Sequence, residues 1–353
     1  MYKRQQKYGG PSRYFIELVK EMQNIYETKP YLVSPVYINN HLNYFNYKYK
    51  IGRYFKSKIN LGSVLKFYNH ISSNFYLRKI RPDILHATYF DDLIASKKIP
   101  LVVTVYDLIH EIYSEDFKVF SPKKNFLDRA DHIICISQNT KTDLQKFYNI
   151  KEDKISVIYL SNFFPNDTPV LKNFIPKKNF LLFVGSRKRY KNFKILLESY
   201  SEINKINKNF DLICFGGGKF LEEEIKAIKD LNLSLDNVKQ YEGEDSFLCS
   251  LYKSATLLVY PSLNEGFGMP ILEAMANNCP VISSNKTSLP EVYGTAALSF
   301  DPKSKDELKF CIEKLIYSED LKKKLILLGK KRVLDFSWKK CANETREVYQ
   351  KLI

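Results

Sequence analysis

The sequence has no apolar run of the roughly 20 residues that a membrane-spanning helix needs, which excludes an integral membrane protein. Its opening residues 1–7 are polar and basic, so we expect no secretory signal. The 6 cysteines show no CxxC spacing, and we expect them to be reduced thiols rather than ligands of a structural zinc site. Nor do we expect any other metal cluster. These absences are typical of a cytosolic globular protein.

Length and composition indicate two folded domains. The chain has 353 residues, of which 44% are apolar and 27% are charged. Such fractions are those of globular rather than disordered chains, and the length exceeds what one hydrophobic core ordinarily organises. We therefore expect two domains of ordinary size.

Positive charge is concentrated at the start of the chain. Residues 1–100 hold 17 lysines and arginines against 6 aspartates and glutamates, or +11 of the total net charge of +16. Within them, residues 42–58 interleave tyrosine and phenylalanine with lysine and arginine. Such a segment suits an anionic membrane surface or a phosphate-bearing acceptor, whereas stacking on nucleic-acid bases is a weaker alternative. The alternatives are that the charge reflects genome composition, and that residues 42–58 form a solvated loop with a few aromatic side chains packed onto the domain.

Short β-prone runs alternate with helical patterns along the chain, which is typical of parallel α/β sheets. A stretch rich in proline and asparagine, residues 161–178, separates two such series. We predict two tandem Rossmann-like domains, residues 1–165 and 166–336, each with a doubly wound parallel sheet, and a cleft between them. Residues 308–328 are predicted to be helical. The expected strands lie at residues 31–37, 83–88, 100–107, 131–137, 155–159, 180–185, 210–215, 237–242, 255–260 and 279–284.

A glycine turn enters the first predicted helix. Gly9 and Gly10 precede an amphipathic pattern that runs to residue 22, and a glycine turn before a helix lets a phosphate approach the backbone. An ordinary loop is an equally good interpretation of two glycines. A Rossmann-like unit should begin with a strand before this turn, yet residues 1–6 are not strand-like. We therefore expect the first strand of this domain to be absent or short.

The most informative stretch is residues 260–276, where a buried strand leads through a glycine loop into a helix. Gly266 and Gly268 allow close approach to the backbone, and the helix N-terminus behind them favours an anion. Glu265 precedes the loop and Glu273 lies one turn into the helix. Phosphate-binding amides beside two carboxylates that can accept from hydroxyls suit a sugar joined to a nucleotide. As an alternative, Glu273 is simply a carboxylate on the helix surface.

Five ordered motifs resemble the retaining glycosyltransferases of family 4, which have the GT-B fold. The E-x7-E spacing from Glu265 to Glu273 matches that family's signature, although the spacing alone occurs often by chance. The resemblance runs from about residue 7 to the C-terminus. The other four motifs are residues 7–13, 130–144, 184–192 and 288–302.

The resemblance implies roles for individual residues. Glu273 would accept from the ribose hydroxyls of a nucleotide-sugar, and Glu265 would lie near the transferred sugar. Arg187 and Lys191 would clamp the diphosphate and stabilise charge on the departing nucleotide, so that no metal or other cofactor is expected. A solvated position for both cations is the alternative. The remaining implied contacts come from Gly9 and Gly10 to the phosphate, from Gly266, Phe267 and Gly268 to sugar and phosphate, and from Tyr241 near the base.

The sequence departs from the family pattern at one position. Many relatives carry a histidine at the end of the strand of residues 100–107, and here Tyr106 stands there, followed by Asp107 and then His110. Any of the three could replace that contact to the sugar. Retaining transfer in the family is pictured as front-side displacement in which the leaving phosphate helps to remove the acceptor proton, so a missing base need not abolish activity.

The resemblance implies a retaining hexosyltransferase that acts in cell-surface polysaccharide or lipopolysaccharide biosynthesis. We expect a nucleotide-diphosphate-sugar donor, first of all GDP-mannose, and a glycan or lipid-linked glycan acceptor at the inner face of the cytoplasmic membrane. We expect no nucleic-acid partner. The likeness also implies that a helix at residues 337–353 packs back on the first domain. Alternatives are a UDP-sugar-dependent transferase of the same fold, a phosphorylase or synthase on this scaffold, and a catalytically weak partner protein that lacks the first strand.

Overall fold

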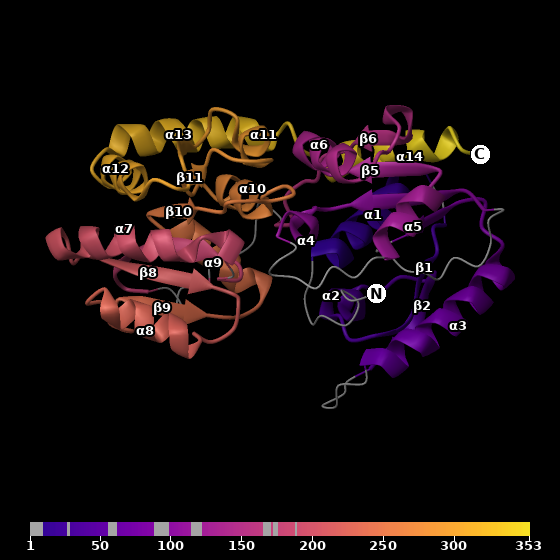
Figure 1. Cartoon of the computed structure of the whole chain (residues 1–353), viewed down its shortest axis with the longest axis horizontal. Coiled ribbons are helices and arrows are strands. Elements are labelled where there is room, and N and C mark those ends of the chain that lie inside the picture. Colours follow the sequence, from indigo (N-terminus) through magenta and orange to yellow (C-terminus); the bar gives the residue numbers. More distant parts are fainter. Residues whose placement is uncertain are drawn as a thin grey trace. The chain divides into compact units, whose positions relative to one another are not determined.

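A computed structural model describes residues 10–26, 29–55, 62–87, 99–113, 122–164, 171, 176–187 and 189–353. Gly9 and most of the expected linker, residues 165–170 and 172–175, lie outside this part of the chain. The chain divides into two compact units (Figure 1). The first comprises residues 1–160 together with 337–353, and the second comprises residues 161–336.

The first unit contains two parallel sheets. One pairs β1 with β2, and the other has the order β3-β4-β5-β6. Its strands are β1 (Leu32–Tyr37), β2 (Lys50–Tyr54), β3 (Leu85–Ala87), β4 (Leu101–Val105), β5 (His132–Cys135) and β6 (Ile155–Val157). Its helices are α1 (Gly10–Tyr26), α2 (Asn40–Tyr44), α3 (Gly62–Ile80), α4 (Ile109–Ile112), α5 (Pro122–Arg129), α6 (Gln138–Phe147) and α14 (Trp338–Gln350), with a short 3₁₀ turn η2 (Glu152–Lys154).

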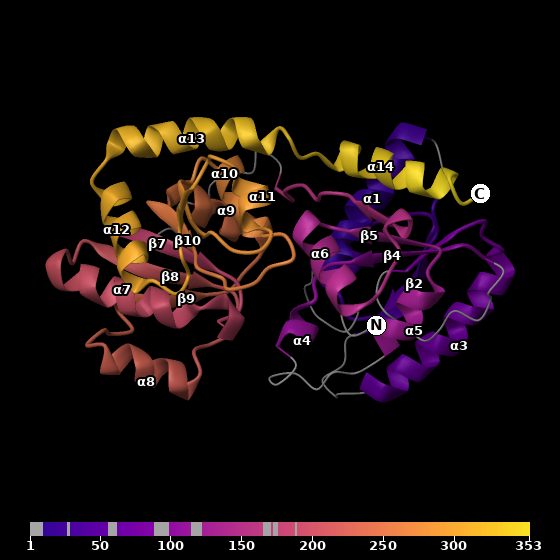
Figure 2. The ribbon, with the colours of Figure 1, turned by 45° about the horizontal axis from the view of Figure 1, so that its top comes forward.

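Apolar runs explain where the core of this unit lies. Every residue of β4 and β5 is buried, as expected for parallel strands covered on both faces. The helix α1 turns one apolar side inward, formed by Tyr14, Phe15, Leu18, Val19 and Met22. Helix α14, from the far end of the sequence, packs against α1 (Figure 2).

The second unit has one six-stranded parallel sheet in the order β12-β11-β10-β7-β8-β9. Counted along the chain this is 6-5-4-1-2-3, the doubly wound order in which the direction of winding reverses between β7 and β10. The strands are β7 (Asn179–Val184), β8 (Phe210–Phe215), β9 (Val238–Tyr241), β10 (Leu257–Tyr260), β11 (Val281–Ser284) and β12 (Leu298–Phe300). The helices are α7 (Phe193–Ile206), α8 (Glu222–Asp230), α9 (Asp245–Ser254), α10 (Met269–Ala276), α11 (Leu289–Tyr293), α12 (Lys305–Ile316) and α13 (Glu319–Val333), and η4 (Arg189–Lys191) is a 3₁₀ turn.

The α/β prediction with parallel sheets is confirmed, and two local expectations are corrected. Residues 308–328 do not form one helix, because α12 ends at Ile316 and Ser318 caps a new helix, its side chain accepting from the Leu321 N–H. The aromatic and basic stretch at residues 42–58 is not only a loop: it contains β2, which pairs with β1. Within it Tyr47 is buried, and its hydroxyl donates to the carbonyl of Pro30 at 2.7 Å.

All 6 cysteines are free thiols in the cores of the two units. Burial raises the pKa of Cys135 and Cys341 to about 12, so both remain protonated. They therefore behave as small apolar side chains, as expected for a reduced protein.

Candidate active site

The crossover point of the second sheet brings two loops together. Strands β7 and β10 are hydrogen-bonded neighbours, and both lead into loops at their carboxyl ends. The first loop carries Gly185 and Lys191, and the second carries Glu265. Ligands of doubly wound sheets bind at this crossover, outside the carboxyl ends of the strands. The topology alone therefore selects these loops as a candidate binding site.

Lys191 and Glu265 form an ion pair at this point. Lys191 Nζ lies 2.5 Å from Glu265 Oε1 and 3.1 Å from the hydroxyl of Tyr260, and the side chains of Lys191 and Glu265 are 13% and 10% exposed. Burial and the Glu265 carboxylate raise the pKa of Tyr260 well above its ordinary value, so its hydroxyl stays neutral. The pair thus presents an ammonium group and a carboxylate beside each other, near the surface and partly shielded from water.

Backbone contacts hold the two loops together. The N–H of Leu263 donates to the carbonyl of Tyr190 at 2.8 Å. Asn192, in the left-handed conformation with φ of 56°, donates from Nδ2 to the carbonyls of Pro261 and Pro302 at 3.2 and 2.7 Å. Asparagine tolerates this conformation better than most residues. Lys191 is therefore fixed by its neighbour in sequence as well as by its own ion pair.

The glycine loop after Glu265 is held by two hydroxyls. Ser288 Oγ donates to the carbonyls of Glu265 and Phe267 at 2.9 and 3.1 Å, and Thr287 Oγ1 accepts from the Glu265 N–H at 3.2 Å. Gly268 has φ of 103°, and a Cβ there would lie 2.6 Å from Leu289 Cδ2. The left-handed φ therefore favours glycine at 268, and a Cβ there would also push the end of the Leu289 side chain aside.

Helix α10 follows this loop and directs its first N–H groups toward it. Pro270 occupies one of its first two positions, where a missing N–H costs nothing. The partial positive charge at this N-terminus makes the loop favourable for an anion. Phe267 itself is buried, with its ring 5.8 Å edge-on from Phe336, so only its backbone is available to a ligand.

Glu273 lies deeper than a helix-surface carboxylate would. It is 5% exposed, and the hydroxyl of Tyr252 donates to its Oε2 at 3.0 Å. Burial and the Glu273 carboxylate raise the pKa of Tyr252 well above its ordinary value. The carboxylate is therefore oriented by a neutral donor, and the surface alternative for Glu273 is wrong.

Arg187 has different partners from Lys191, and the expectation that the two clamp one diphosphate stays a prediction. Its Nε donates to Glu224 Oε1 at 2.9 Å, and its terminal nitrogens donate to the carbonyls of Gly216 and Gly218 at 2.9 and 2.8 Å. The guanidinium also stacks on Phe220 at 4.8 Å, and the side chain is 2% exposed. Its donors are thus used to hold the triple-glycine turn after β8.

Tyr241 ends strand β9 next to that turn. The N–H of Gly216 donates to the Tyr241 carbonyl at 2.9 Å, and the Tyr241 ring meets Phe247 edge-on at 5.8 Å. Its half-buried ring therefore lies at the edge strand β9, two strands away from β7.

The first unit carries the other predicted residues. Tyr106 and Asp107 follow β4 directly, Tyr106 being 9% exposed, and Asp107 Oδ1 accepts from the Ile109 N–H at 3.3 Å. His110 is exposed on the short helix α4. Gly10 begins α1, and a Cβ added there would meet no atom within 4 Å. Gly9 lies outside the described residues.

Sequence reasoning missed the residues that support the carboxylates. Tyr252, Thr287 and Ser288 each hydrogen-bond to a site residue; Tyr252 and Thr287 lie outside the five motifs, and Ser288 is the first residue of the motif at residues 288–302. Among the described residues, no group of three or more His, Cys, Asp or Glu side chains could hold a metal ion. In the same part of the chain, no helix is both long and apolar enough to cross a membrane.

Two family models together match most of the chain. Residues 8–160 match Glycosyltransferase Family 4, and residues 167–332 match Glycosyl transferases group 1. The chain is 31% identical over 282 residues to an uncharacterized glycosyltransferase of Methanocaldococcus jannaschii, and the match covers 76% of each protein.

Two further relatives are mannosyltransferases. O-antigen chain mannosyltransferase B of Escherichia coli is 29% identical over 64% of this chain, and O-antigen chain mannosyltransferase RfbU of Salmonella typhimurium is 32% identical over 57%. The matches span 62% and 56% of these relatives' own lengths.

Solved structures share the fold at low sequence identity. Sucrose-phosphate synthase from Thermosynechococcus elongatus has a TM-score of 0.76 at 18% identity, over 99% of this chain and 95% of that one. HepE from Anabaena, in complex with UDP and glucose, has a TM-score of 0.75 at 17% identity, over 98% and 97%. The chain belongs to the family 4 glycosyltransferases, and it has their GT-B fold.

Proposed function

We propose that this protein transfers a hexose, with retention of configuration, from a nucleotide-diphosphate sugar to a glycan or lipid-linked glycan in cell-surface polysaccharide assembly. The observation that carries the proposal is the ion pair of Lys191 and Glu265 at the crossover of the second sheet, beside the glycine loop and the N-terminus of α10. A cation and the positive end of a helix suit a diphosphate, and a neighbouring carboxylate suits sugar hydroxyls.

The chemistry follows from where charge develops. The bond between the anomeric carbon and the diphosphate oxygen breaks, the acceptor oxygen bonds to that carbon, and the acceptor proton passes to the departing phosphate. Lys191 and the amides of residues 266–268 stabilise the negative charge on the leaving group. Glu265 positions the sugar, Glu273 accepts from the ribose, and Tyr241 lies near the base. Arg187 acts indirectly, because it holds the triple-glycine turn.

The Lys191 assignment is tested by Lys191→Met, with Lys194→Met as its matched control. Lys194 is three residues away, and its side chain is 85% exposed. Loss of one transition-state contact of this kind ordinarily lowers kcat by about 100- to 1,000-fold. We expect that loss for Lys191→Met and none for Lys194→Met. Equal activity of the two variants refutes the assignment.

The donor proposal is GDP-mannose. It is supported by the two O-antigen mannosyltransferase relatives, whereas the structural neighbour in complex with UDP and glucose supports the alternative of a UDP-sugar. Small changes near the base and sugar switch donors, so a direct measurement decides. Thermal stabilisation by GDP and slow hydrolysis of GDP-mannose with initial release of the α-anomer are expected. Stabilisation by UDP and not by GDP would replace the donor, and no response to any donor would favour the weak partner protein.

The acceptor side involves Tyr106, Asp107 or His110 in the first unit. Tyr106→Phe, Asp107→Asn and His110→Ala, measured separately, identify which of them acts on the sugar. The variant that removes the contact should lower kcat. If kcat is unchanged in all three, this loop has no part in the reaction.

We further propose that the reaction needs no metal and takes place at the cytoplasmic face of the membrane. The concentration of positive charge in residues 1–100 supports contact with anionic lipid. Activity should survive EDTA, and the protein should co-sediment with vesicles that contain phosphatidylglycerol but not with neutral ones. Loss of activity in EDTA would contradict the metal-independent reaction. Equal sedimentation with both kinds of vesicle would contradict the contact with anionic lipid.

A further inference from the structure

Helix α13 of the second unit has two sides of different character. Its inner side joins the core of the unit through Leu321, Leu325 and Leu328. Figure 2 shows α13 along the outside of this unit, with α10 and α11 on one side of it. The opposite side is therefore part of the surface of the second unit, and it takes no part in the proposed reaction.

The exposed residues of this surface share one face of the helix. Successive residues of an α-helix lie about 100° apart around its axis, and residue 334, the C-cap, keeps helical backbone angles with φ of −67° and ψ of −19°. By this spacing, six exposed residues fall within an arc of about 120°. They form what we call the α13 face: Lys323, Lys324, Leu327, Lys330, Lys331 and Leu334.

Two leucines form the middle line of the α13 face. Leu327 is 61% exposed and Leu334 is 82% exposed, and they lie seven residues, or about 10 Å, apart along the axis. A single exposed leucine needs no explanation. Here, however, lysines occupy all four helical neighbours of Leu327, at residues 323, 324, 330 and 331. Two of these lysines lie on each side of the apolar line.

The acidic residues close to α13 engage other cations. Glu319 pairs with Lys322 at 2.6 Å, and Asp335 pairs with Arg332 at 2.7 Å. Both Lys322 and Arg332 lie outside the arc of the α13 face. In the part of the chain that the structure describes, none of the four lysines of the face forms an ion pair. The face therefore presents four positive charges to the solvent.

This arrangement suits an anionic bilayer better than a soluble polyanion. A soluble polyanion would bind the lysines but would gain nothing from the two leucines. A helix that lies on a bilayer inserts apolar side chains between the lipid headgroups, while lysines on either side extend to the phosphates. The apolar line with cations on both sides is the pattern of such a helix.

We propose that the α13 face is a separate attachment surface for an anionic lipid bilayer. Leu327 and Leu334 insert between the headgroups, and the four lysines bind the lipid phosphates. Such a contact presupposes the membrane setting of the proposed function, but it needs neither the transfer reaction nor residues 1–100. The second unit, which carries Lys191 and Glu265, would thereby have its own contact with the membrane.

A fluorophore on the α13 face tests the contact directly. All 6 natural cysteines are buried, so a cysteine introduced at the surface can be labelled selectively. Leu327→Cys carries nitrobenzoxadiazole, whose emission rises and shifts to shorter wavelength in an apolar environment. Leu235→Cys, which replaces another exposed leucine of the second unit, carries the same label as the matched control. Both variants are mixed with vesicles that contain phosphatidylglycerol, in the absence of any donor.

The label at residue 327 should at least double its emission, and the label at residue 235 should not respond. An unchanged label at residue 327 on protein that co-sediments with the vesicles would show attachment through other residues, and it overturns the proposal. An equal response at both positions overturns it as well, and so does a failure of the protein to bind these vesicles. Because no donor is present, the result does not depend on whether the protein transfers a sugar.

Removing the lysines provides a second test, on the full chain. One variant carries glutamine at the four lysines of the α13 face. The matched control carries glutamine at four other exposed lysines of the second unit, which are Lys205, Lys208, Lys226 and Lys229. Both variants lose the same charge, and both should keep the Tm and the rate of donor hydrolysis in solution.

Each basic residue close to an anionic surface strengthens binding about fivefold. Contact through residues 1–100 would limit the loss, so we expect affinity for the vesicles to fall at least tenfold in the α13 variant and less than threefold in the control. Equal losses would show an effect of total charge alone and overturn the proposal. If the α13 variant has a lowered Tm, the labelled Leu327→Cys protein, which keeps all four lysines, decides.

Dextran sulfate tests for a soluble polyanion as the partner. If it binds the natural protein and not the α13 variant, while the label at residue 327 does not respond to vesicles, the α13 face binds a soluble polyanion and the proposal fails. A response of that label to vesicles supports the bilayer even if dextran sulfate also binds.

Discussion

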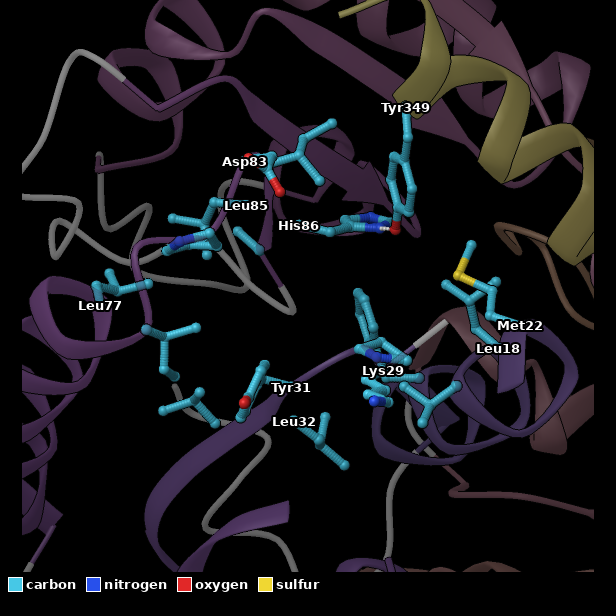
Figure 3. Close-up of a pocket in the computed structure, with 18 of the residues that line it drawn as sticks. Leu18, Met22, Lys29, Tyr31, Leu32, Leu77, Asp83, Leu85, His86 and Tyr349 are labelled. Carbon is cyan, nitrogen blue, oxygen red and sulfur yellow. Dashed lines mark hydrogen bonds between the residues drawn. The ribbon is translucent and has the colours of Figure 1, made fainter. Parts of the chain in front are cut away.

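Acidification should destabilise the first unit through one histidine. His86 is partly buried, with Nδ1 2.6 Å from the hydroxyl of Tyr349 (Figure 3) and Nε2 2.7 Å from Thr104 Oγ1. A neutral ring fits both, because one nitrogen accepts from Tyr349 and the other donates to Thr104. Burial lowers the pKa of His86 from 6.5 to about 3. Protonation would remove the acceptor and bury a charge.

The sign and size follow from linkage. The folded pKa lies below the unfolded one, so His86 contributes stability above pH 6.5 that is lost as the pH falls toward 3. Within that window, each pH unit lowers the free energy of unfolding by about 1.4 kcal/mol. The loss of unfolding free energy between pH 7 and pH 4.5 is therefore about 2.5 kcal/mol. Tyr14 and Tyr349 do not titrate there, since burial raises the pKa of both.

Urea unfolding followed by tryptophan fluorescence measures this loss. Trp338 is the only tryptophan of the chain and lies in α14, with its ring centroid 6.1 Å from that of Tyr14, so its emission reports on the first unit. The difference in unfolding free energy between the natural protein and His86→Gln should shrink by about 2.5 kcal/mol from pH 7 to pH 4.5. His110→Gln, at an exposed position, should follow the natural protein. A difference between the natural protein and His86→Gln that does not vary with pH refutes the reasoning.

Three other substitutions separate binding from folding. Gly10→Ala should keep or slightly raise the Tm, because a Cβ at this position meets no atom within 4 Å. If a phosphate approaches Gly10, the same substitution should raise the KM for the donor. An unchanged KM removes Gly10 from the donor site. Gly268→Ala should lower both Tm and kcat, since the φ of 103° and the 2.6 Å contact with Leu289 force the loop to move, and calorimetry with a transfer assay checks both. Arg187→Met should lower the Tm, because it frees the turn at residues 216–218 and leaves Glu224 without its arginine partner. Donor binding should weaken as a consequence of this loss of structure. A normal Tm with lost donor binding would instead place Arg187 at the phosphate.

The sequence was most predictive where structure is local. Apolar runs located the central strands of both units, because parallel strands covered on both faces leave a continuous apolar signal, and β10 with its glycine loop is the best example. The break between α12 and α13 was missed, although Ser318 followed by two acidic residues is a sequence signal for a helix start.

Arg187 illustrates what the sequence could not supply. Its partner Glu224 is 37 residues away, and the spacing from Arg187 to Lys191 gave no indication that the two side chains have different partners. Glu224 also accepts from the Leu221 N–H at the start of α8, so one carboxylate orders both a helix end and an arginine.

The chain passes between its two units twice, and this sets an order for folding during synthesis. Residues 161–336 form a continuous unit, so they can fold as soon as they leave the ribosome. The first unit is synthesised first but includes residues 337–353, and α14 supplies Tyr349 to His86 and covers α1. The core of the first unit therefore stays incomplete, with apolar side chains exposed, until translation is nearly finished. Ribosome-bound chains that stop before residue 337 should accordingly need a chaperone for their first half and not for their second.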